Sequence, residues 1–499
     1  MRVIKYVCLS DLHLGEEDSL LTGITEEGKA APDKLSPVLG GLAECFRDLL
    51  KDQEDKPTLI LCGDVLELAL CTMDVAGMAF ETFLRSTMRP GEELFAKSIF
   101  YLPGNHDHHL WELARETQYV EWFKRHALEG IPLAPPRHIT PLIQLGERQR
   151  VPSYFLNGLL KRLARQEDND SWNDIKFSVR YPNMGIAEGD RLALFSHGHY
   201  LESAYGAVST AKDLLFDSGR PGSMNELEAH NFAWIDFFWS ALGRSGDAGE
   251  SVEMVYENLR SKEKVAALIE NLARNISSRY MDNLPGWIKS NSVLSKIFKI
   301  LYAFFRGRER EVTDTAMSEK LRKGLHEYLE NYLRGQIEKD LPGRDYRRVI
   351  FTFGHTHKPL AMDMTDFDGY PTWVDVYNTG GWVVDEVEPQ PVHGASAVLL
   401  DEELNAAAVR LYQEKKDGGI RPVAVSEADH LGEAAGPFKK YLAEKVASST
   451  GPWADLTDVV GREVSKRREF LRARIEMIEK NRPAPSLAPR TKAGFKSTT

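Results

Sequence analysis

The sequence has few cysteines, no long apolar run and no excess of positive charge, and each shortage argues against a class of protein. Four cysteines occur in 499 residues, and none forms a C-x-x-C pair, which disfavours a disulfide framework or a thiolate zinc site. No stretch approaches the ~20 apolar residues of a membrane-spanning helix. Lysine and arginine number 63 against 74 aspartates and glutamates, a formal net charge of −11, which is a poor start for a general DNA- or RNA-coating protein.

The first residues also lack the features of a leader. Residues 1–15 hold only a short apolar run before aspartate and histidine appear, whereas a signal peptide needs a longer apolar core and a small-residue cleavage site. With 42% hydrophobic and 27% charged residues, the composition is that of a globular protein. We therefore expect a cytoplasmic protein without a transmembrane segment, in which Cys8 and Cys62 are buried, reduced thiols.

Strand-like and helix-like segments alternate in the first 200 residues. Strands are predicted at 3–9, 58–62, 98–102, 175–181 and 191–195, and helices at 37–50 and 75–85. This alternation indicates a layered α/β architecture with a well-covered sheet. Strand signals then vanish and return at 348–353, 372–377, 395–400 and 406–412.

The interruption predicts one catalytic domain with a large insert. Its two parts are residues 1–199 and 346–415, and residues 200–345 are expected to form a helical insertion, with helices at 251–280 and 315–337. Residues 416–480 are predicted to form a helical C-terminal extension, with a long helix at 457–480. Residues 481–499 have the composition of a disordered tail.

Five polar segments, each after a predicted strand, carry most of the chemical information. They are Asp11-Leu-His13, Gly63-Asp64, Gly104-Asn105-His106-Asp107, Ser196-His197-Gly198-His199 and Gly354-His355-Thr356-His357. Loops that follow parallel strands meet at one edge of a sheet. Asp-x-His or Gly-Asp alone reads as an ordinary turn, and Gly-His-x-His alone fits a solvated loop about as well as a metal site, but five such segments together are not explained as surface turns. Carboxylate, imidazole and amide groups suit two adjacent divalent ions such as Mn, Fe, Zn or Co.

In this order the five segments resemble the calcineurin-like metallophosphoesterase superfamily, whose pattern is D-x-H, G-D, G-N-H-[D/E], H and G-H-x-H. The resemblance covers residues 1–199 and about 349–412. It implies that superfamily's layered sandwich fold and a dinuclear metal-dependent hydrolase of phosphate esters or pyrophosphates, which uses a hydroxide held between the two ions. Manganese is the metal expected first.

The resemblance also assigns residues. It implies one ion held by Asp11, His13 and His357, a second held by Asn105, His197 and His355, and a bridge between them through Asp64. It further implies His106 at the leaving-group oxygen, with Glu67 as the acid that orients it.

The motif spacing most resembles the UDP-2,3-diacylglucosamine hydrolase-like branch, which cleaves a pyrophosphate in a lipid precursor at the membrane surface. The chain departs from that branch in three ways. It is about twice as long, it has His199 where the branch has aspartate, and it has His106 where the branch has arginine. A phosphorylated small molecule or lipid is therefore the expected substrate. A nuclease of the same superfamily and a non-catalytic scaffold are the alternatives; the acidic composition disfavours nucleic acid, and the full ligand set disfavours a scaffold.

Further expectations concern the surroundings of these segments. Asp107 either caps the following helix or takes part in catalysis, His108 and His109 are expected to be exposed, and the turn at Asn378 is expected to give structural support. The basic amphipathic segment at 292–310 reads either as an ordinary packed helix or as a peripheral membrane contact. The insertion starts directly after the fourth polar segment, so it can act as a lid.

Overall fold

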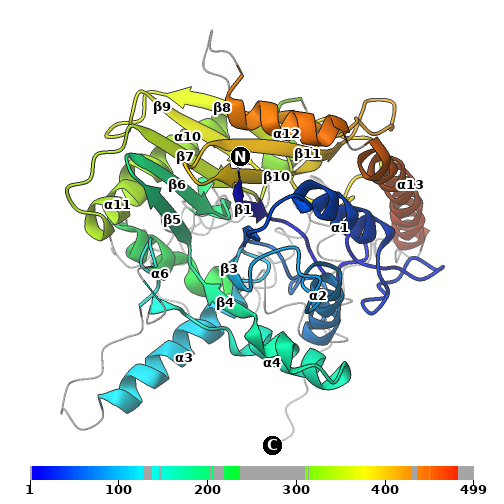
Figure 1. The fold of residues 1–499 in the computed structure, drawn as a ribbon, viewed down its shortest axis with the longest axis horizontal. Coiled ribbons are helices and arrows are strands. Elements are labelled where there is room, and N and C mark those ends of the chain that lie inside the picture. The colour runs from blue at the N-terminus through cyan, green and yellow to red at the C-terminus, as the bar shows by residue number, and fades with distance from the viewer. Residues whose placement is uncertain are drawn as a thin grey trace, which may run out of the picture.

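A computed structural model describes most of the chain (Figure 1). The described residues are 3–126, 137–144, 146, 149–202, 205, 209, 219, 221–236, 309–312, 314–428, 435–448 and 450–480. The helix predicted at 251–280, the tail at 481–499 and nearly all of the amphipathic segment at 292–310 lie outside the described residues. Those three predictions therefore stay predictions.

The larger of two β-sheets joins the beginning of the chain to its later part. It has seven strands in the order β12-β11-β10-β1-β2-β3-β4. Strands β1 to β4 are parallel, and β10, β11 and β12 continue the sheet in antiparallel pairs. Their bounds are β1 Ile4–Leu9, β2 Thr58–Cys62, β3 Ser98–Leu102, β4 Lys176–Val179, β10 Gly394–Asp401, β11 Ala406–Gln413 and β12 Ala424–Ser426.

The second sheet has five strands in the order β5-β6-β7-β9-β8. Its central strands β6, β7 and β9 are parallel, and β5 and β8 pair antiparallel at the two edges. The bounds are β5 Asn183–Glu188, β6 Arg191–Ser196, β7 Arg348–Phe353, β8 Leu360–Thr365 and β9 Trp373–Asn378. The adjacent strands β6 and β7 are thus joined by the long segment that the sequence identifies as an insertion.

The two sheets face each other across a buried apolar layer. Cys8 and Ile60 of the larger sheet pack in one cluster with Ala193 and Ile350 of the smaller sheet. Because side chains alternate along a strand, Val7 and its alternate neighbours point the other way, into a second cluster formed with helices. The fold is therefore a sandwich of two sheets with helices outside.

Helices cover both outer faces of the sandwich (Figure 1). Helices α1, α2, α4 and α13 pack on the larger sheet, and α6 and α10 pack on the smaller one. The bounds are α1 Pro37–Leu50, α2 Met73–Thr87, α3 His109–Arg125, α4 Tyr154–Gln166, α6 Met224–Ile235, α10 Glu319–Tyr328, α11 Arg334–Asp340, α12 Pro437–Ser448 and α13 Thr450–Lys480. Short helical turns are η2 Asp170–Asp174, η3 His199–Leu201, η7 Glu309–Glu311 and the π-helical turn η8 Leu329–Leu333. None of the described helices combines the length and apolar character needed to cross a bilayer.

The layered α/β class and the helical C-terminal extension are confirmed. The predicted strands at 58–62, 98–102 and 348–353 coincide with β2, β3 and β7, and the predicted helix at 37–50 coincides with α1. Two details of the regions predicted to be helical differ from the prediction. The extension also contains a strand, β12, which pairs with β11, and the helix predicted at 315–337 is divided by the π-helical turn η8.

Candidate metal centre

Loops at the carboxyl ends of strands from both sheets come together at one place. Those after β1, β2 and β3 belong to the larger sheet, and those after β6 and β7 belong to the smaller sheet. These loops carry all seven predicted metal ligands and both predicted acid–base residues. All nine are buried except His355, which is partly buried. The structure thus brings the predicted residues together from positions far apart in the sequence.

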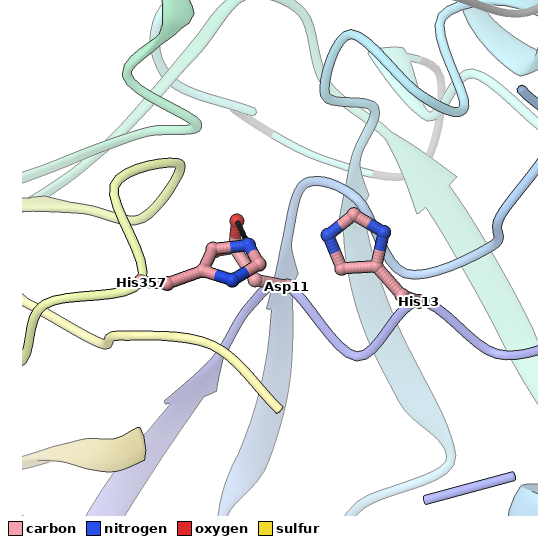
Figure 2. A group of neighbouring side chains, drawn as sticks. All are labelled: Asp11, His13 and His357. Carbon is pink, nitrogen blue, oxygen red and sulfur yellow. Dashed lines mark ion pairs between the residues drawn. The ribbon is translucent and has the colours of Figure 1, made fainter. Parts of the chain in front are cut away.

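One group of ligand atoms comes from the loops after β1 and β7. A carboxylate oxygen of Asp11 and ring nitrogens of His13 and His357 all lie within 4.8 Å of one another. His357 Nε2 is 3.4 Å from Asp11 Oδ1. In Figure 2 the His357 ring overlaps the Asp11 carboxylate, and the His13 imidazole lies to one side of both. This spacing fits a single metal ion held by three side chains.

A second group surrounds His197. Asp64, His197 and His355 also place ligand atoms within 4.8 Å of one another. His197 Nε2 lies 3.1 Å from Asp64 Oδ2, 3.0 Å from Asn105 Oδ1 and 3.2 Å from His355 Nδ1. One imidazole nitrogen therefore faces a carboxylate, an amide oxygen and another imidazole at once, which is an arrangement typical of a metal site.

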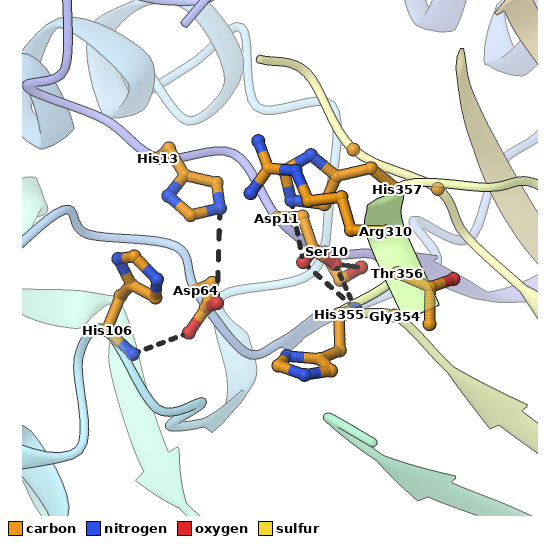
Figure 3. A network of polar contacts seen from close by, with 12 residues as sticks. Ser10, Asp11, His13, Asp64, His106, Arg310, Gly354, His355, Thr356 and His357 are labelled. Carbon is orange, nitrogen blue, oxygen red and sulfur yellow. Dashed lines mark hydrogen bonds and ion pairs between the residues drawn. The ribbon is translucent and has the colours of Figure 1, made fainter. Parts of the chain in front are cut away.

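Asp64 lies between the two groups (Figure 3). Its Oδ2 atom is 3.1 Å from His197 Nε2 and 3.9 Å from His13 Nε2. Its other oxygen, Oδ1, accepts a hydrogen bond of 2.8 Å from the backbone N–H of His106. That hydrogen bond fixes the carboxylate, so that its free edge is presented to both groups.

Five of the seven predicted ligands adopt a left-handed backbone conformation. Their φ angles are 51° at Asp11, 44° at His13, 48° at Asp64, 68° at His355 and 57° at His357. Such angles are uncommon for residues other than glycine, and each costs about 1–3 kcal/mol unless the surroundings enforce it. The strain is concentrated at the residues whose side chains converge, which marks this place as a functional site.

Glycines beside these residues make room for the ligand side chains. A Cβ atom added at Gly104 would lie 2.2 Å from Asp64 Oδ1, and one added at Gly354 would lie 2.2 Å from Asp11 Oδ2. Neither distance is compatible with an ordinary van der Waals contact. The glycines of the G-N-H and G-H-x-H segments are therefore needed for the close approach of the two carboxylates.

Glu67 contacts two imidazoles. Its Oε2 atom lies 2.7 Å from His13 Nδ1 and 2.8 Å from His106 Nδ1. Its Oε1 atom accepts backbone hydrogen bonds from Ala69 and Leu70. Sequence reasoning connected this acid with His106 alone. The structure adds His13, so one carboxylate orients a predicted metal ligand and the predicted leaving-group residue together.

Asp107 does not cap the helix that follows it, contrary to one of the two expectations from the sequence. Its carboxylate accepts hydrogen bonds from the backbone N–H groups of Val65 (3.0 Å) and Gly104 (2.6 Å) and from the hydroxyl of Tyr101 (2.6 Å). It therefore ties the loop after β2 to the loop after β3. The residue at the N-cap of α3 is His108, without a side-chain capping bond.

Asn378, the last residue of β9, supports the fifth segment as predicted. Its Nδ2 group donates to Gly354 O at 2.9 Å and to Thr356 Oγ1 at 3.0 Å. Its Oδ1 atom accepts from Gly380 N at 2.7 Å. The side chain of Asn378 thus holds the loop that carries two predicted ligands, His355 and His357. Its hydrogen bonds go to other residues and not to the side chains of those ligands.

The expectation that His108 and His109 are exposed is wrong. His108 is fully buried and His109 is only 15% exposed. His108 Nε2 lies 2.9 Å from Glu228 Oε1, and the hydroxyl groups of Tyr181 and Tyr200 donate to Glu228 Oε2. Glu228 is on α6, within the predicted insertion. In a single sequence its carboxylate looks like any solvent-facing helix residue, so no signal could have linked it to the third and fourth polar segments.

Three of the four imidazoles that would bind metal are predominantly neutral; at the fourth, His197, burial is outweighed by Asp64, which raises the pKa to about 9. Burial lowers the pKa of His13, of His355 and, to well below the usual value, of His357. A histidine must be unprotonated to coordinate a metal ion. Moreover, His13 Nε2 and His357 Nδ1 are buried with no hydrogen-bond partner among the described residues. The donor set and these two unpartnered nitrogens both fit a divalent ion.

The carboxylates of the site differ in their protonation. Burial opposes ionisation of Asp64, but the charges of His197 and His106 outweigh burial and hold the pKa of Asp64 well below its usual value. Burial raises the pKa of Asp11 to about 7, against the opposing effect of His197. Asp64 is therefore the permanently charged carboxylate at the centre of the cluster.

Two facing sheets with imidazoles and carboxylates gathered at their strand ends define a metal-site protein of the α/β sandwich class. Residues 4–221 match the calcineurin-like phosphoesterase family. The match contains the first four polar segments, from Asp11 to His199. Over these residues the chain is similar to the calcineurin-like phosphoesterases. The comparison with curated proteins gave no match.

Proposed function

We propose that the protein is a dinuclear metal-dependent hydrolase of phosphate esters or pyrophosphates. The observation that carries this proposal is the position of Asp64 between two groups of ligand atoms, 3.9 Å from His13 Nε2 and 3.1 Å from His197 Nε2. A carboxylate between two such groups is suited to bridge two ions. The match to the calcineurin-like phosphoesterase family and the neutral imidazoles of His13, His355 and His357 support the same proposal.

The two groups would hold one ion each. The proposed ligands are Asp11, His13 and His357 for the first ion, Asn105, His197 and His355 for the second, and Asp64 for both. Manganese is proposed first, and iron, zinc or cobalt would suit the same donors. When bound, two such ions would stabilise phosphoryl oxygens as Lewis acids and lower the pKa of a water molecule.

We assign His106 to the leaving-group oxygen. Glu67 engages Nδ1 of this imidazole, which orients Nε2 as the nitrogen that would donate a proton to the departing alkoxide or phosphate. Burial disfavours the protonated form of His106, but Glu67 and Asp64 outweigh it and raise its pKa. A protonated imidazole is the form that a general acid requires.

Residues 200–345 are proposed as an insertion that covers this site as a lid, between two parts of one catalytic domain at 1–199 and 346–415. Contacts of its described residues support this. Glu202 lies 3.7 Å from His355 Nε2, and Glu309 lies 3.4 Å from Lys358 Nζ, directly after the fifth polar segment. The substrate class proposed is a phosphorylated small molecule or lipid. A nuclease and a non-catalytic scaffold remain the competing functions.

The test compares Asp64→Asn with a matched control, Asp190→Asn, at a turn residue whose side chain is 53% exposed. Both proteins are loaded with Mn²⁺, and metal content and hydrolysis of an aryl phosphodiester are measured. We expect Asp64→Asn to lose metal from both positions and to lose activity, and Asp190→Asn to keep both. Full metal content and a near-normal rate in Asp64→Asn would refute the dinuclear proposal.

A panel of substrates then separates the competing functions. Phosphomonoesters, phosphodiesters, nucleotide pyrophosphates and DNA are each tested with the Mn²⁺-loaded protein. Turnover of the small esters or pyrophosphates supports the proposal, and turnover of DNA alone favours the nuclease. A protein that binds two ions and turns over none of the four would favour a scaffold.

A further inference from the structure

A short segment of the proposed insertion, η7 with Arg310 at its centre, is fixed beside the candidate metal centre by contacts on both sides. The backbone N–H of Glu309 donates to Glu202 Oε1 at 2.9 Å. The backbone carbonyl of Arg310 lies 3.0 Å from Nε2 of His393. The Glu309 carboxylate contacts Nζ of Lys358 at 3.4 Å. Contacts with Glu202 after β6, Lys358 after β7 and His393 before β10 therefore hold the segment around residue 310.

The contact with Lys358 is buried. Lys358 follows His357 directly in the chain and is 0% exposed, and Glu309 is 4% exposed. The ammonium group also donates to Thr315 O at 3.1 Å, and the Glu309 carboxylate accepts from the backbone N–H of Ser318 at 2.9 Å. A buried ammonium is costly unless it is paired and hydrogen-bonded. Both conditions are met here, so the segment is a built part of the site wall.

The side chain of Arg310 brings a positive charge to the candidate metal centre. Figure 3 draws its guanidinium in the same close-up as Asp11 and His357. Burial is the main reason that the pKa of His357 is low, and the charge of Arg310 lowers it further. The guanidinium is anchored at Nε by an ion pair with Asp385, in the loop after β9, and its side chain is 21% exposed. An anchored, partly exposed guanidinium beside a metal centre is placed to receive an anion.

We infer that Arg310 is a substrate-binding residue, which holds a non-bridging phosphoryl oxygen of the substrate against the proposed metal ions. This inference rests on the proposed function. The planar guanidinium matches the geometry of phosphate and forms charge-assisted hydrogen bonds with it. The ion pair with Asp385 fixes the direction of the guanidinium before substrate arrives, so less conformational freedom is lost on binding. In this way the insertion would contribute a substrate-binding side chain in addition to covering the site.

The experiment uses the full-length, Mn²⁺-loaded protein and inorganic phosphate as the probe. Arg310→Ala removes the guanidinium, Arg310→Lys keeps the charge without the planar fork, and Asp385→Asn loosens the anchor but keeps the guanidinium. Arg322→Ala is the matched control, because Arg322 belongs to the same insertion and pairs with Glu319 on α10. Phosphate affinity is measured by calorimetry, metal content by elemental analysis, and KM and kcat with an aryl phosphomonoester.

We expect Arg310→Ala to bind phosphate about 10- to 100-fold more weakly, which is the range for one lost hydrogen-bonding contact with a charged group. Arg310→Lys should lose less, Asp385→Asn should lose less than Arg310→Ala, and Arg322→Ala should match the wild type. KM should rise with the loss of affinity, while metal content stays the same. If Arg310→Ala fails to fold, the comparison of Arg310→Lys with Asp385→Asn decides in the same way.

Two results would overturn the inference. One is phosphate affinity in Arg310→Ala equal to that of Arg322→Ala. The other is an equal loss in Asp385→Asn and in Arg310→Ala, which would make Arg310 a structural tether to Asp385. Failure of the proposed function is recognised separately. A wild-type protein that binds phosphate through Arg310 and hydrolyses none of the tested esters would contradict the hydrolase and support this inference.

Discussion

The substitution Gly104→Ala tests whether metal binding and catalysis depend on the position of the Asp64 carboxylate. A methyl group added at Gly104 would lie 2.2 Å from Asp64 Oδ1, 2.6 Å from Asp64 N and 2.8 Å from His197 Cδ2. Since atoms in contact sit about 3.5–4.0 Å apart, Gly104→Ala must push the Asp64 carboxylate aside by roughly 1 Å or more. Gly104 is not among the glycines with positive φ, so the backbone itself accepts alanine. The perturbation is therefore a displacement of two proposed ligands together with the backbone at Asp64.

The expected loss is large. Misplacement of a catalytic group by about 1 Å costs roughly 10²-fold in rate. We expect Gly104→Ala to lower kcat on an aryl phosphodiester by at least that factor and to reduce metal content at the position that His197 shares with Asp64. Overpacking should also lower the free energy of unfolding by about 1–3 kcal/mol. Rates, metal content and urea denaturation of the same preparation provide the three readouts.

Gly158→Ala is the matched control. Gly158 lies within α4, and a Cβ atom there would meet nothing within 4 Å. Alanine is favoured over glycine inside a helix by about 0.5–1 kcal/mol, so this variant should keep full activity and gain a little stability. The reasoning would be refuted by wild-type metal content and rate in Gly104→Ala. It would be refuted equally if Gly158→Ala showed the same losses.

Three further predictions concern residues around the cluster. His106→Ala should lower kcat about 10²–10⁴-fold without loss of metal, and less with a nitrophenolate leaving group; an equal loss with poor leaving groups would contradict proton donation. Glu67→Gln should lower metal affinity about 10- to 100-fold as well as kcat, because its carboxylate also contacts a proposed ligand; an unchanged metal titration would exclude that second role. Burial disfavours protonation of His108, but Asp236 and Glu228 outweigh it and raise its pKa to about 9, so its stabilising contribution is complete below about pH 6.5 and is lost as the pH rises through 9. The difference in unfolding free energy between the wild type and His108→Gln should therefore shrink over that interval, and a difference independent of pH would count against the charged pair.

The sequence allowed the candidate site to be predicted because each segment carries its own chemical signature. The G-D, G-N-H and G-H-x-H segments combine a glycine with a ligand, and Gly104 and Gly354 show the reason: their missing Cβ atoms leave room for carboxylates from other loops. The strands before these segments were predicted well because they are short and apolar. Each segment contains its own recognisable ligand residues, although the site forms only when loops from both sheets come together.

Elements without such signatures were missed. Strand β5 contains Gly185 and few β-branched residues, and it exists because its edge pairs with β6. Strand β12 has three residues and depends on β11 for its hydrogen bonds. Glu228 and Arg310 are charged residues in a helical region, and only their tertiary neighbours distinguish them from surface residues. In these cases the sequence does not identify the strand or side chain that each residue contacts in the folded protein.

The place of β1 within the larger sheet has a consequence for the order in which the protein can assemble during synthesis. β1 lies between β2 and β10, and Ile4 pairs with Asp401. A nascent chain that has emerged only as far as β6 carries Asp11 and His197 and neither of the two histidines that follow β7. Pairing β1 with β10 closes a loop of nearly 400 residues, from Ile4 to Asp401. Such long-range contacts form slowly, because the entropic cost of closing the loop must be met first. Neither proposed ion can therefore have its full set of ligands until the loop after β7 has been synthesised and β10 has paired with β1, so metal bound before that stage would be held by an incomplete site.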